Sequence, residues 1–391
     1  MRPSNSTDSQ ILFLFPRNAG FPPTRGDAHR VFSIAKLSVN SEIQASVFYL
    51  GEGKPFTFSQ IQFYPISGKI TADPSVASRI TFLGLARDFF RFTMATTSFA
   101  WKNRRKQTVL YGHTPVGGLV AAVAKLFTGL RFIYDPHDWH YDSWAVYHRS
   151  LGPLKRSCAI LSYRMLGFIL PRVSNTVVCV SDPMVCSIKG ANKKILIPNI
   201  VEDLPTDDTD LHEENGLVLF VGHLAGYQGL FNLIRAFQFV TATRDGSSLL
   251  IVGDGEDKTA AKDLVRRIGL DNVIFTGAVS HDQAYEYTRK ASVCVAPFLP
   301  LPFVRTSCPI KLLEYVAMNK RIVVTDIPEF RDMLKGYGNA KFAEATPEGL
   351  AQTIIAALES PLGNGSPRDF DMNSQTGPVH DELRSLFDTG L

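Results

Sequence analysis

The sequence lacks an apolar run long enough to cross a membrane. A spanning helix needs about 18 or more consecutive apolar residues, and the best stretch, at 157–171, is interrupted by Arg164 and stops at Pro171. The first ten residues are polar and hold one Arg, and the apolar run 11–15 that follows is too short for the core of a signal peptide. We therefore expect a cytoplasmic protein that does not span a bilayer.

Cysteine is also scarce. The 391 residues include five, an odd number, at positions 158, 179, 186, 294 and 308. They form no Cys-x-x-Cys pair and no His/Cys cluster with the spacing of a metal site. We expect reduced thiols, most of them packed as small core side chains, and no structural metal.

The net charge of +4 conceals a division between the two halves of the chain. Residues 1–200 hold 24 Lys and Arg against 10 Asp and Glu, whereas residues 201–391 hold 17 against 27. This division predicts that the basic half faces an anionic partner, such as a phosphorylated acceptor or a membrane surface. An uneven spread of solubilising charge is the alternative.

Short runs rich in Val, Ile, Leu and Phe recur along the chain, with amphipathic stretches between them. The alternation predicts an α/β fold of parallel strands and crossover helices, and the continuous apolar character of the runs is typical of sheets covered on both faces. The predicted strands are 11–15, 45–50, 108–112, 131–135, 176–180, 217–222, 248–252, 272–276, 292–297 and 321–325.

An acidic stretch over 202–214 has little to bury and predicts a linker. We expect a Rossmann-like domain over 1–203, a second one over 204–360, and a tail over 361–391 whose short helix near 378–388 packs back on the first domain. Ligands bind at the carboxyl ends of strands in open α/β sheets. Two doubly wound domains facing each other across a cleft would therefore share one site.

The most informative segment runs from Thr306 to Val324. It predicts a loop, a helix with Pro309 in its first turn, and a strand. Free backbone N–H groups and the positive end of the helix dipole suit a diphosphate there, and Lys311 adds a cation. Glu314 has the chemistry to accept hydrogen bonds from ribose hydroxyls. A solvated surface glutamate is the alternative, which its apolar neighbours disfavour.

This segment resembles the donor-site motif of glycosyltransferase family 4, the retaining nucleotide-sugar transferases of GT-B architecture. Residues 309–317 carry the pattern Pro-x-Lys-Leu-x-Glu-Tyr-x-Ala. The resemblance runs from residue 11 to residue 335 and is firmest in the C-terminal half. Other stretches match in the expected order: 180–182, 197–199, 220–222 with 228–230, 251–255 and 275–279.

The resemblance implies a metal-independent donor site. The diphosphate would lie on the helix that begins near Pro309, the ribose on Glu314 and the base on the backbone around Gly277. Lys311 would also be catalytic, because it and the helix dipole would stabilise the leaving diphosphate. The implied donor-binding residues are Gly222, His223, Gln228, Gly253, Gly277, Ala278, Val279, Pro309, Ile310, Lys311 and Glu314.

Several positions depart from the family pattern. Many members keep a second glutamate where this chain has Thr306, and an Arg and a Lys where it has His223 and Gln228. Lys311 or Arg305 would then have to supply the missing positive charge. The departures leave the donor sugar unassigned.

The N-terminal half holds the candidate catalytic residues and the candidate acceptor-side residues. By resemblance, His137 sits where the family keeps a histidine near the anomeric carbon, with Asp138 orienting it, and both are catalytic candidates. A structural histidine that caps the next helix is the alternative. The acceptor-side candidates are His113, which follows a predicted strand, and Arg25 with Gly26, in the loop after the first strand.

Two basic stretches mix cations with large apolar side chains. Residues 79–107 hold seven Lys and Arg against one Asp, and residues 143–181 hold five against none. The pattern is typical of an interfacial membrane helix and equally of a crossover helix that buries one face. An anionic membrane is therefore one expected partner of the chain, whereas nucleic acid is not.

These observations predict a glycosyltransferase that moves a sugar, with retention, from a UDP- or GDP-sugar to a glycan or lipid-linked acceptor. The nucleotide sugar is a co-substrate, and no cofactor is expected. The alternatives are a soluble acceptor, a catalytically silent donor-binding subunit, or an epimerase or phosphorylase of the same architecture. A Rossmann dehydrogenase is disfavoured, because the turn at 253–255 lacks the third glycine.

Overall fold

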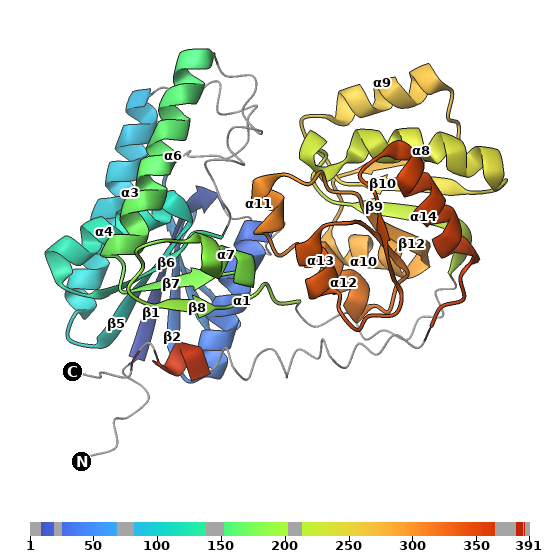
Figure 1. The fold of residues 1–391 in the computed structure, drawn as a ribbon. Coiled ribbons are helices and arrows are strands. Elements are labelled where there is room, and N and C mark those ends of the chain that lie inside the picture. Colours follow the sequence, from blue (N-terminus) through green and yellow to red (C-terminus); the bar gives the residue numbers. More distant parts are fainter. Residues whose placement is uncertain are drawn as a thin grey trace. The chain divides into compact units, whose positions relative to one another are not determined.

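The computed structural model describes residues 9–18, 26–68, 82–137, 152–201, 213–363, 381–385 and 387. The chain divides into two compact units (Figure 1). The first comprises Met1–Asn199, Thr306–Cys308 and Gln375–Leu391, and the second comprises Ile200–Arg305 and Pro309–Ser374. Each unit has its own sheet flanked by helices, which confirms the predicted α/β class.

The first unit contains an eight-stranded sheet. Its strands are β1 (Ser9–Asn18), β2 (Gln44–Leu50), β3 (Phe56–Phe58), β4 (Ile61–Ile66), β5 (Gln107–His113), β6 (Arg131–Asp135), β7 (Thr176–Cys179) and β8 (Lys194–Leu196). The order is β3-β4-β2-β1-β5-β6-β7-β8, and all neighbours are parallel except β3 and β4. The apolar run 11–15 is at most 1% exposed, as expected for a strand covered on both faces.

The helices of the first unit lie on both faces of this sheet. They are α1 (Gly26–Asn40), α3 (Phe82–Asn103), α4 (Thr114–Thr128), α6 (Pro153–Val173) and α7 (Asp182–Ser187). The chain moves from β1 to β2 in one direction along the sheet and from β4 through β5 and β6 to β7 in the other. Right-handed crossovers therefore put α1 on one face and α3, α4 and α6 on the other. No helix in the described residues is long and apolar enough to cross a membrane.

The second unit contains a six-stranded parallel sheet. Its strands are β9 (Glu214–Val221), β10 (Ser248–Val252), β11 (Val273–Gly277), β12 (Ala291–Ala296), β13 (Ile322–Thr325) and β14 (Ala340–Ala343), in the order β11-β10-β9-β12-β13-β14. The reversal of direction between β11 and β12 is that of a doubly wound fold, with a ligand-binding edge at the carboxyl ends.

The helices of the second unit cover both faces of its sheet. They are α8 (Leu230–Thr243), α9 (Lys258–Ile268), α10 (His281–Lys290), α11 (Pro302–Arg305), α12 (Ile310–Ala317), α13 (Pro328–Met333) and α14 (Pro347–Glu359), with a 3₁₀ turn η2 at Gly226–Gln228. Because β9 to β11 run in one direction and β12 to β13 in the other, α8 and α9 lie on the face opposite α10 and α12. Buried Phe220, Phe237 and Leu350 belong to the core between β9, α8 and α14.

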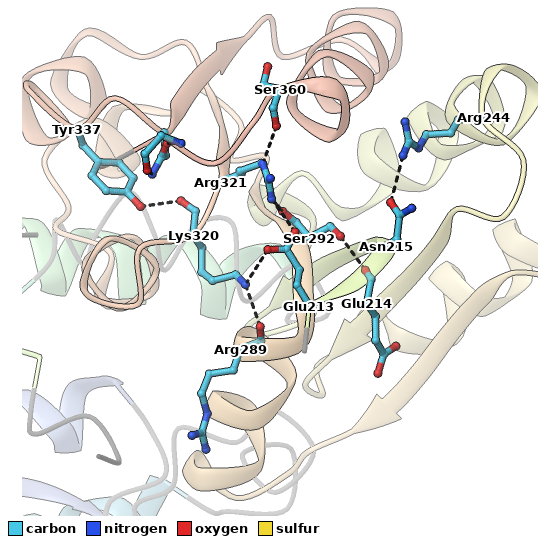
Figure 2. A network of polar contacts seen from close by, with 12 residues as sticks. Glu213, Glu214, Asn215, Arg244, Arg289, Ser292, Lys320, Arg321, Tyr337 and Ser360 are labelled. Carbon is cyan, nitrogen blue, oxygen red and sulfur yellow. Dashed lines mark hydrogen bonds and ion pairs between the residues drawn. The ribbon is translucent and has the colours of Figure 1, made fainter. Parts of the chain in front are cut away.

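A polar network closes the amino edge of the second sheet (Figure 2). Arg321 Nη1 donates to a Glu213 carboxylate oxygen at 2.6 Å and to the Ser292 carbonyl oxygen at 3.3 Å, and Arg321 Nε donates to the Ser360 carbonyl oxygen at 2.9 Å. Lys320 Nζ lies 3.9 Å from Glu213. These contacts join the starts of β9, β12 and β13. The network is structural, since it lies at the edge opposite the carboxyl ends.

All five cysteines are free thiols. Cys179, Cys294 and Cys308 are buried, as expected of core cysteines, whereas Cys158 and Cys186 are exposed. Burial raises the pKa of Cys179 and of Cys294 to about 12. These two thiols therefore stay protonated and unreactive at neutral pH.

Candidate functional site

Three turns lie together at the carboxyl edge of the second sheet, after β9, β10 and β11. The Gly222 N–H donates to the Val252 carbonyl oxygen at 3.0 Å, and the Gly253 N–H to the Gly277 carbonyl oxygen at 2.9 Å. A Cβ on Gly253 would lie 1.9 Å from the Gly222 carbonyl oxygen, so a side chain does not fit there. The fold thus brings the predicted glycines Gly222, Gly253 and Gly277 to one edge.

Lys311 reaches the same edge from the first turn of α12. Its Nζ donates to Gln228 Oε1 at 2.8 Å and lies 4.6 Å from the ring centroid of Phe220 and 5.0 Å from that of Phe298. A Cβ on Gly222 would lie 2.6 Å from this Nζ, so the glycine gives the ammonium its space. The three predicted residues Gly222, Gln228 and Lys311 are therefore in contact.

Burial lowers the pKa of Lys311 to about 7, although Glu314 acts in the opposite direction. Charged and neutral forms are therefore present in similar amounts at neutral pH. An anion bound beside Nζ would favour the charged form and raise this pKa again. The charge of Lys311 would therefore respond to an anion beside it.

The start of α12 adds backbone donors. Pro309 is the residue before the helix, with φ −66°, rather than a residue of the first turn as predicted. Its carbonyl oxygen accepts from the Leu312 N–H at 3.0 Å. The N–H groups of Ile310 and Lys311 stand at the positive end of the helix without intrahelical acceptors.

Glu314 is held by the neighbouring helix α10. Its Oε1 lies 2.9 Å from His281 Nε2 and accepts from the Tyr285 hydroxyl at 3.4 Å. Both of these contacts go to Oε1, so Oε2 is the oxygen placed to accept from a ligand. His281 begins α10 directly after the turn that contains exposed Ala278 and half-buried Val279. The predicted ribose and base positions therefore lie on elements in contact.

Two other residues named in the sequence analysis lie against carboxylates: His223, where a family cation is missing, and Arg305, the other residue considered for the missing charge. His223 Nε2 lies 2.7 Å from Glu256, and Arg305 lies 2.8 Å from Glu329. The hydrogen-bond partner of Lys311 is the neutral amide of Gln228. Of Lys311 and Arg305, Lys311 is the one without a carboxylate at ion-pair distance among the described residues.

The first unit holds a buried charged cluster at the carboxyl edge of its sheet. Asp135 Oδ2 accepts from Arg30 Nε at 2.8 Å and from the Tyr111 hydroxyl at 2.7 Å, and it lies 3.1 Å from His113 Nδ1. Arg30 is 2% exposed and the other three are fully buried. Burial alone would raise the pKa of Asp135, but Arg30 and then His113 outweigh it and hold this pKa well below its usual range. The carboxylate therefore stays ionised and directs the Nδ1–H of His113 towards itself.

The same carboxylate positions His137. This residue has a left-handed backbone (φ 62°), and its N–H donates to Asp135 Oδ1 at 3.0 Å. The ring centroids of His113 and His137 are 5.2 Å apart. Arg30 Nη2 and His113 Nε2 are buried and have no hydrogen-bond partner among the residues that the structure describes. Buried groups of this kind are normally satisfied by a ligand or water.

The remaining predicted positions fall on other parts of the chain. Arg25 and Asp138 lie outside the described residues, and Gly26 is the first residue of α1. The Thr306 carbonyl oxygen accepts from the Ser181 hydroxyl at 2.7 Å within the first unit. No group of His, Cys, Asp or Glu suited to a metal ion occurs in the described residues.

Sequence reasoning missed the residues that hold the candidates in place. Arg30 and Asp135 are 105 positions apart and gave no local signal of pairing. His281 had one, because Ser280 and Gln283 form a capping box that marks the start of a helix. That signal locates the residue without showing that it contacts Glu314.

Residues 215–360 match the model of the family Glycosyl transferases group 1. An uncharacterized glycosyltransferase of Haemophilus influenzae is 26% identical over 110 residues, which cover 28% of this chain and 30% of that protein. An uncharacterized glycosyltransferase of Methanocaldococcus jannaschii is 22% identical over 145 residues, 34% of each chain. The chain spans about a third of the length of the curated relatives it matches.

Solved structures resemble nearly the whole chain. Sucrose-phosphate synthase from Thermosynechococcus elongatus has a TM-score of 0.69 at 15% identity, over 97% of this chain and 95% of that one. Anabaena HepE in complex with UDP and glucose has a TM-score of 0.67 at 16% identity, over 96% and 99%. The trehalose-phosphate synthase of Burkholderia xenovorans in complex with glucose-6-phosphate has 0.64 at 14%, over 97% and 99%. The fold is that of the GT-B glycosyltransferases.

Proposed function

We propose that this protein is a retaining glycosyltransferase that takes a sugar from a nucleotide-diphosphate sugar bound by the second unit. The observation that carries the proposal is the contact of Lys311 with Gln228 and Gly222, at the carboxyl edge of the region that matches Glycosyl transferases group 1. An uncompensated lysine, free helix N–H groups and a close glycine turn are the features that a diphosphate requires.

Each part of the donor then has a place. The diphosphate lies against Gly222 and the start of α12, the ribose hydroxyls donate to Glu314, and the base lies along the backbone after Gly277. When the glycosidic bond to the diphosphate breaks, negative charge grows on the leaving phosphate, where Lys311 and the α12 dipole stabilise it. This scheme needs no metal ion.

UDP-sugars are the first donors to test. HepE has been solved with UDP and with UDP-glucose, and the Burkholderia xenovorans protein is described as UDP-forming. These ligands belong to proteins of at most 17% identity, so for this chain a UDP-sugar is a proposal and a GDP-sugar the alternative.

We assign the acceptor to the carboxyl edge of the first sheet. His137 and His113 stand there on one ionised carboxylate, and the open positions at Arg30 Nη2 and His113 Nε2 suit a polar hydroxyl-bearing molecule. His137 acts on the reacting hydroxyl or the donor sugar as charge develops. A lipid-linked or phosphorylated glycan fits the basic character of this half.

Ligand-induced stabilisation tests donor binding. A donor present at about 100 times its Kd stabilises the folded state by about 2.7 kcal/mol, so the right member of a panel of UDP-, GDP- and ADP-sugars raises the melting temperature. Lys311→Met should abolish the rise, whereas Lys262→Met, which removes an exposed lysine of α9, should keep it. No rise with any nucleotide sugar would contradict the assignment of the second unit.

A catalytically silent donor-binding subunit is the second candidate. Thr306 stands where many family members keep an acid, and it is buried in the first unit with its carbonyl oxygen bound to Ser181. Release of free nucleotide during incubation with donor and a panel of acceptors distinguishes the two. Donor binding without nucleotide release from the purified chain would favour the silent subunit.

A further inference from the structure

The exposed apolar side chains of this protein are concentrated on three neighbouring helices. Of the 18 exposed large hydrophobic residues in the described part of the chain, 12 belong to α3, α4 and α6. We call these 12 the apolar set of the α3–α4–α6 face. They are Leu85, Phe90, Met94, Trp101, Leu126, Phe127, Leu154, Leu161, Met165, Phe168, Ile169 and Val173.

The three helices lie side by side on one face of the first sheet, with α4 in contact with both others (Figure 1). A single exposed leucine is ordinary, but a large grouped set is typical of an interaction surface. The helices also differ from ordinary crossovers. Only Leu170 and Pro171 of the 21 residues of α6 are buried, whereas α8, with 14 residues, buries six. Much of the apolar surface of α6 therefore has no partner among the described residues.

The charged groups on this face are almost all cations. Exposed Lys and Arg are Arg87, Arg91, Lys102, Arg104, Arg105, Lys106, Lys155, Arg164 and Arg172. The one acid in α3, α4, α6 and the loop 104–106 is Asp88, which is 1% exposed. Arg87 Nε lies 3.2 Å from this carboxylate, so one of the nine cations is paired on its own helix. The face still carries a large excess of positive charge, because Asp88 is the one acid of these elements.

Cations and apolar groups are interleaved on this face. The Arg104 guanidinium lies 3.9 Å from the ring centroid of Trp101, and the Arg172 guanidinium lies 3.6 Å from that of Phe168. Each pair presents a flat apolar ring and a positive charge at the same point of the surface. This arrangement suits a boundary between anionic groups and an apolar layer.

We propose that the α3–α4–α6 face docks on an anionic lipid bilayer. Nucleic acid would neutralise the cations but leave the apolar set in water. A bilayer with anionic headgroups satisfies both, because headgroup phosphates meet the cations while apolar side chains enter the boundary of the acyl layer, about 5–10 Å deep. The face is separate from the carboxyl-edge sites, so this proposal does not depend on the proposed transfer reaction.

Vesicle co-sedimentation of the full chain tests this docking. The probes are vesicles of phosphatidylcholine alone and of phosphatidylcholine with about a third phosphatidylglycerol, at low and high salt. We expect sedimentation with the anionic vesicles only, and a steep fall as salt shortens the Debye length from about 10 Å at 0.1 M to about 3 Å at 1 M. Equal sedimentation with both vesicle types would overturn the proposal.

Two double variants separate the contributions of charge and apolar contact. Lys102→Glu with Lys155→Glu should weaken partitioning at least about 25-fold, since each cation near an anionic surface is worth about fivefold. Leu161→Ser with Phe168→Ser should also weaken partitioning. The factor by which this variant weakens partitioning, relative to the wild type at the same salt, should not change as salt rises.

Matched changes on the second unit serve as controls. Lys262→Glu with Arg267→Glu on α9 makes the same charge change on exposed residues, and Phe239→Ser with Ile274→Ser removes exposed apolar groups. Both controls should sediment like the wild type, with unchanged melting temperatures in all four variants. Equal losses of sedimentation in controls and test variants would refute docking through the α3–α4–α6 face. The proposal would also be refuted if the chain were a dimer without vesicles and Leu161→Ser with Phe168→Ser made it a monomer. The face would then bind a second copy of the chain.

Discussion

The depressed pKa of Lys311 couples donor binding to pH. Burial holds this pKa at about 7, against an ordinary value of 10.5, and a diphosphate beside Nζ stabilises the protonated form. If the bound pKa returns towards the ordinary value, the affinity for UDP falls by up to tenfold per pH unit above pH 7, or about 50-fold between pH 7 and 9. Binding near pH 7 should also take up on the order of half a proton.

Calorimetric titration of UDP above pH 7 measures this slope. The second ionisation of a phosphate lies near pH 6, so the ligand keeps its full charge in this range. Lys311→Arg keeps a permanent charge and should give a nearly flat profile, and Lys311→Met should bind weakly at every pH. Lys262→Met should keep the wild-type slope. A flat wild-type profile, or the same slope in Lys311→Met, would refute the role of this lysine.

The same residue should lower the stability of the free protein. In the unfolded chain Lys311 regains its ordinary pKa, so the unfolded state binds more protons between pH 7 and 10.5, and the free energy of unfolding rises with pH over that range. Removing the charge removes this penalty. Without nucleotide at pH 7, Lys311→Met should therefore melt no lower than the wild type, which distinguishes a lost ligand contact from a damaged fold.

Three further variants test the other candidates. Glu314→Gln should weaken donor binding by about 1–3 kcal/mol, because it replaces a charged acceptor with an amide of the same shape. Unchanged affinity would remove Glu314 from the site, and Glu348→Gln, at an exposed residue of α14, is the control. His137→Ala should lower turnover about 100-fold or more while nucleotide affinity stays near the wild-type value; parallel losses of both would favour a structural role. Asp135→Asn should lower the free energy of unfolding by about 3–5 kcal/mol in denaturant titrations, because it leaves Arg30 charged and buried. Adding Arg30→Met should recover part of that loss. An unchanged free energy of unfolding in Asp135→Asn would contradict the ionised cluster.

Apolar runs located the central strands and the edge strand β11 but missed four others. All ten predicted runs correspond to strands, since strands covered on both faces are rich in apolar residues. The missed strands are β3, β4, β8 and β14. Every residue of β3 is exposed, β4 contains Pro65 and alternating exposed positions, and β8 and β14 have only three and four residues. Such strands form by pairing with an existing edge, so their own sequence carries little periodic signal.

Sequence reasoning predicted more of the candidate site in the second unit than in the first. Lys311 and Glu314 are three positions apart on one helix, so the spacing alone placed them near each other. The link between His137 and His113 is Asp135, whose partner Arg30 comes from a helix 105 positions earlier. No local pattern encodes that contact. It exists because parallel strands bring β5 and β6 to the same edge as α1.

The two edges of the second sheet differ in how far their charged groups are satisfied. At the amino edge of the second sheet, Arg321 meets Glu213 and two carbonyl oxygens, so the network is complete without a ligand. At the carboxyl edge, Lys311 has only a neutral amide and loses part of its charge, and in the first unit Arg30 Nη2 and His113 Nε2 have no partner among the described residues. Buried polar groups left unsatisfied in this way cost stability. Their presence at both carboxyl edges therefore supports the proposal of a polar ligand on each sheet.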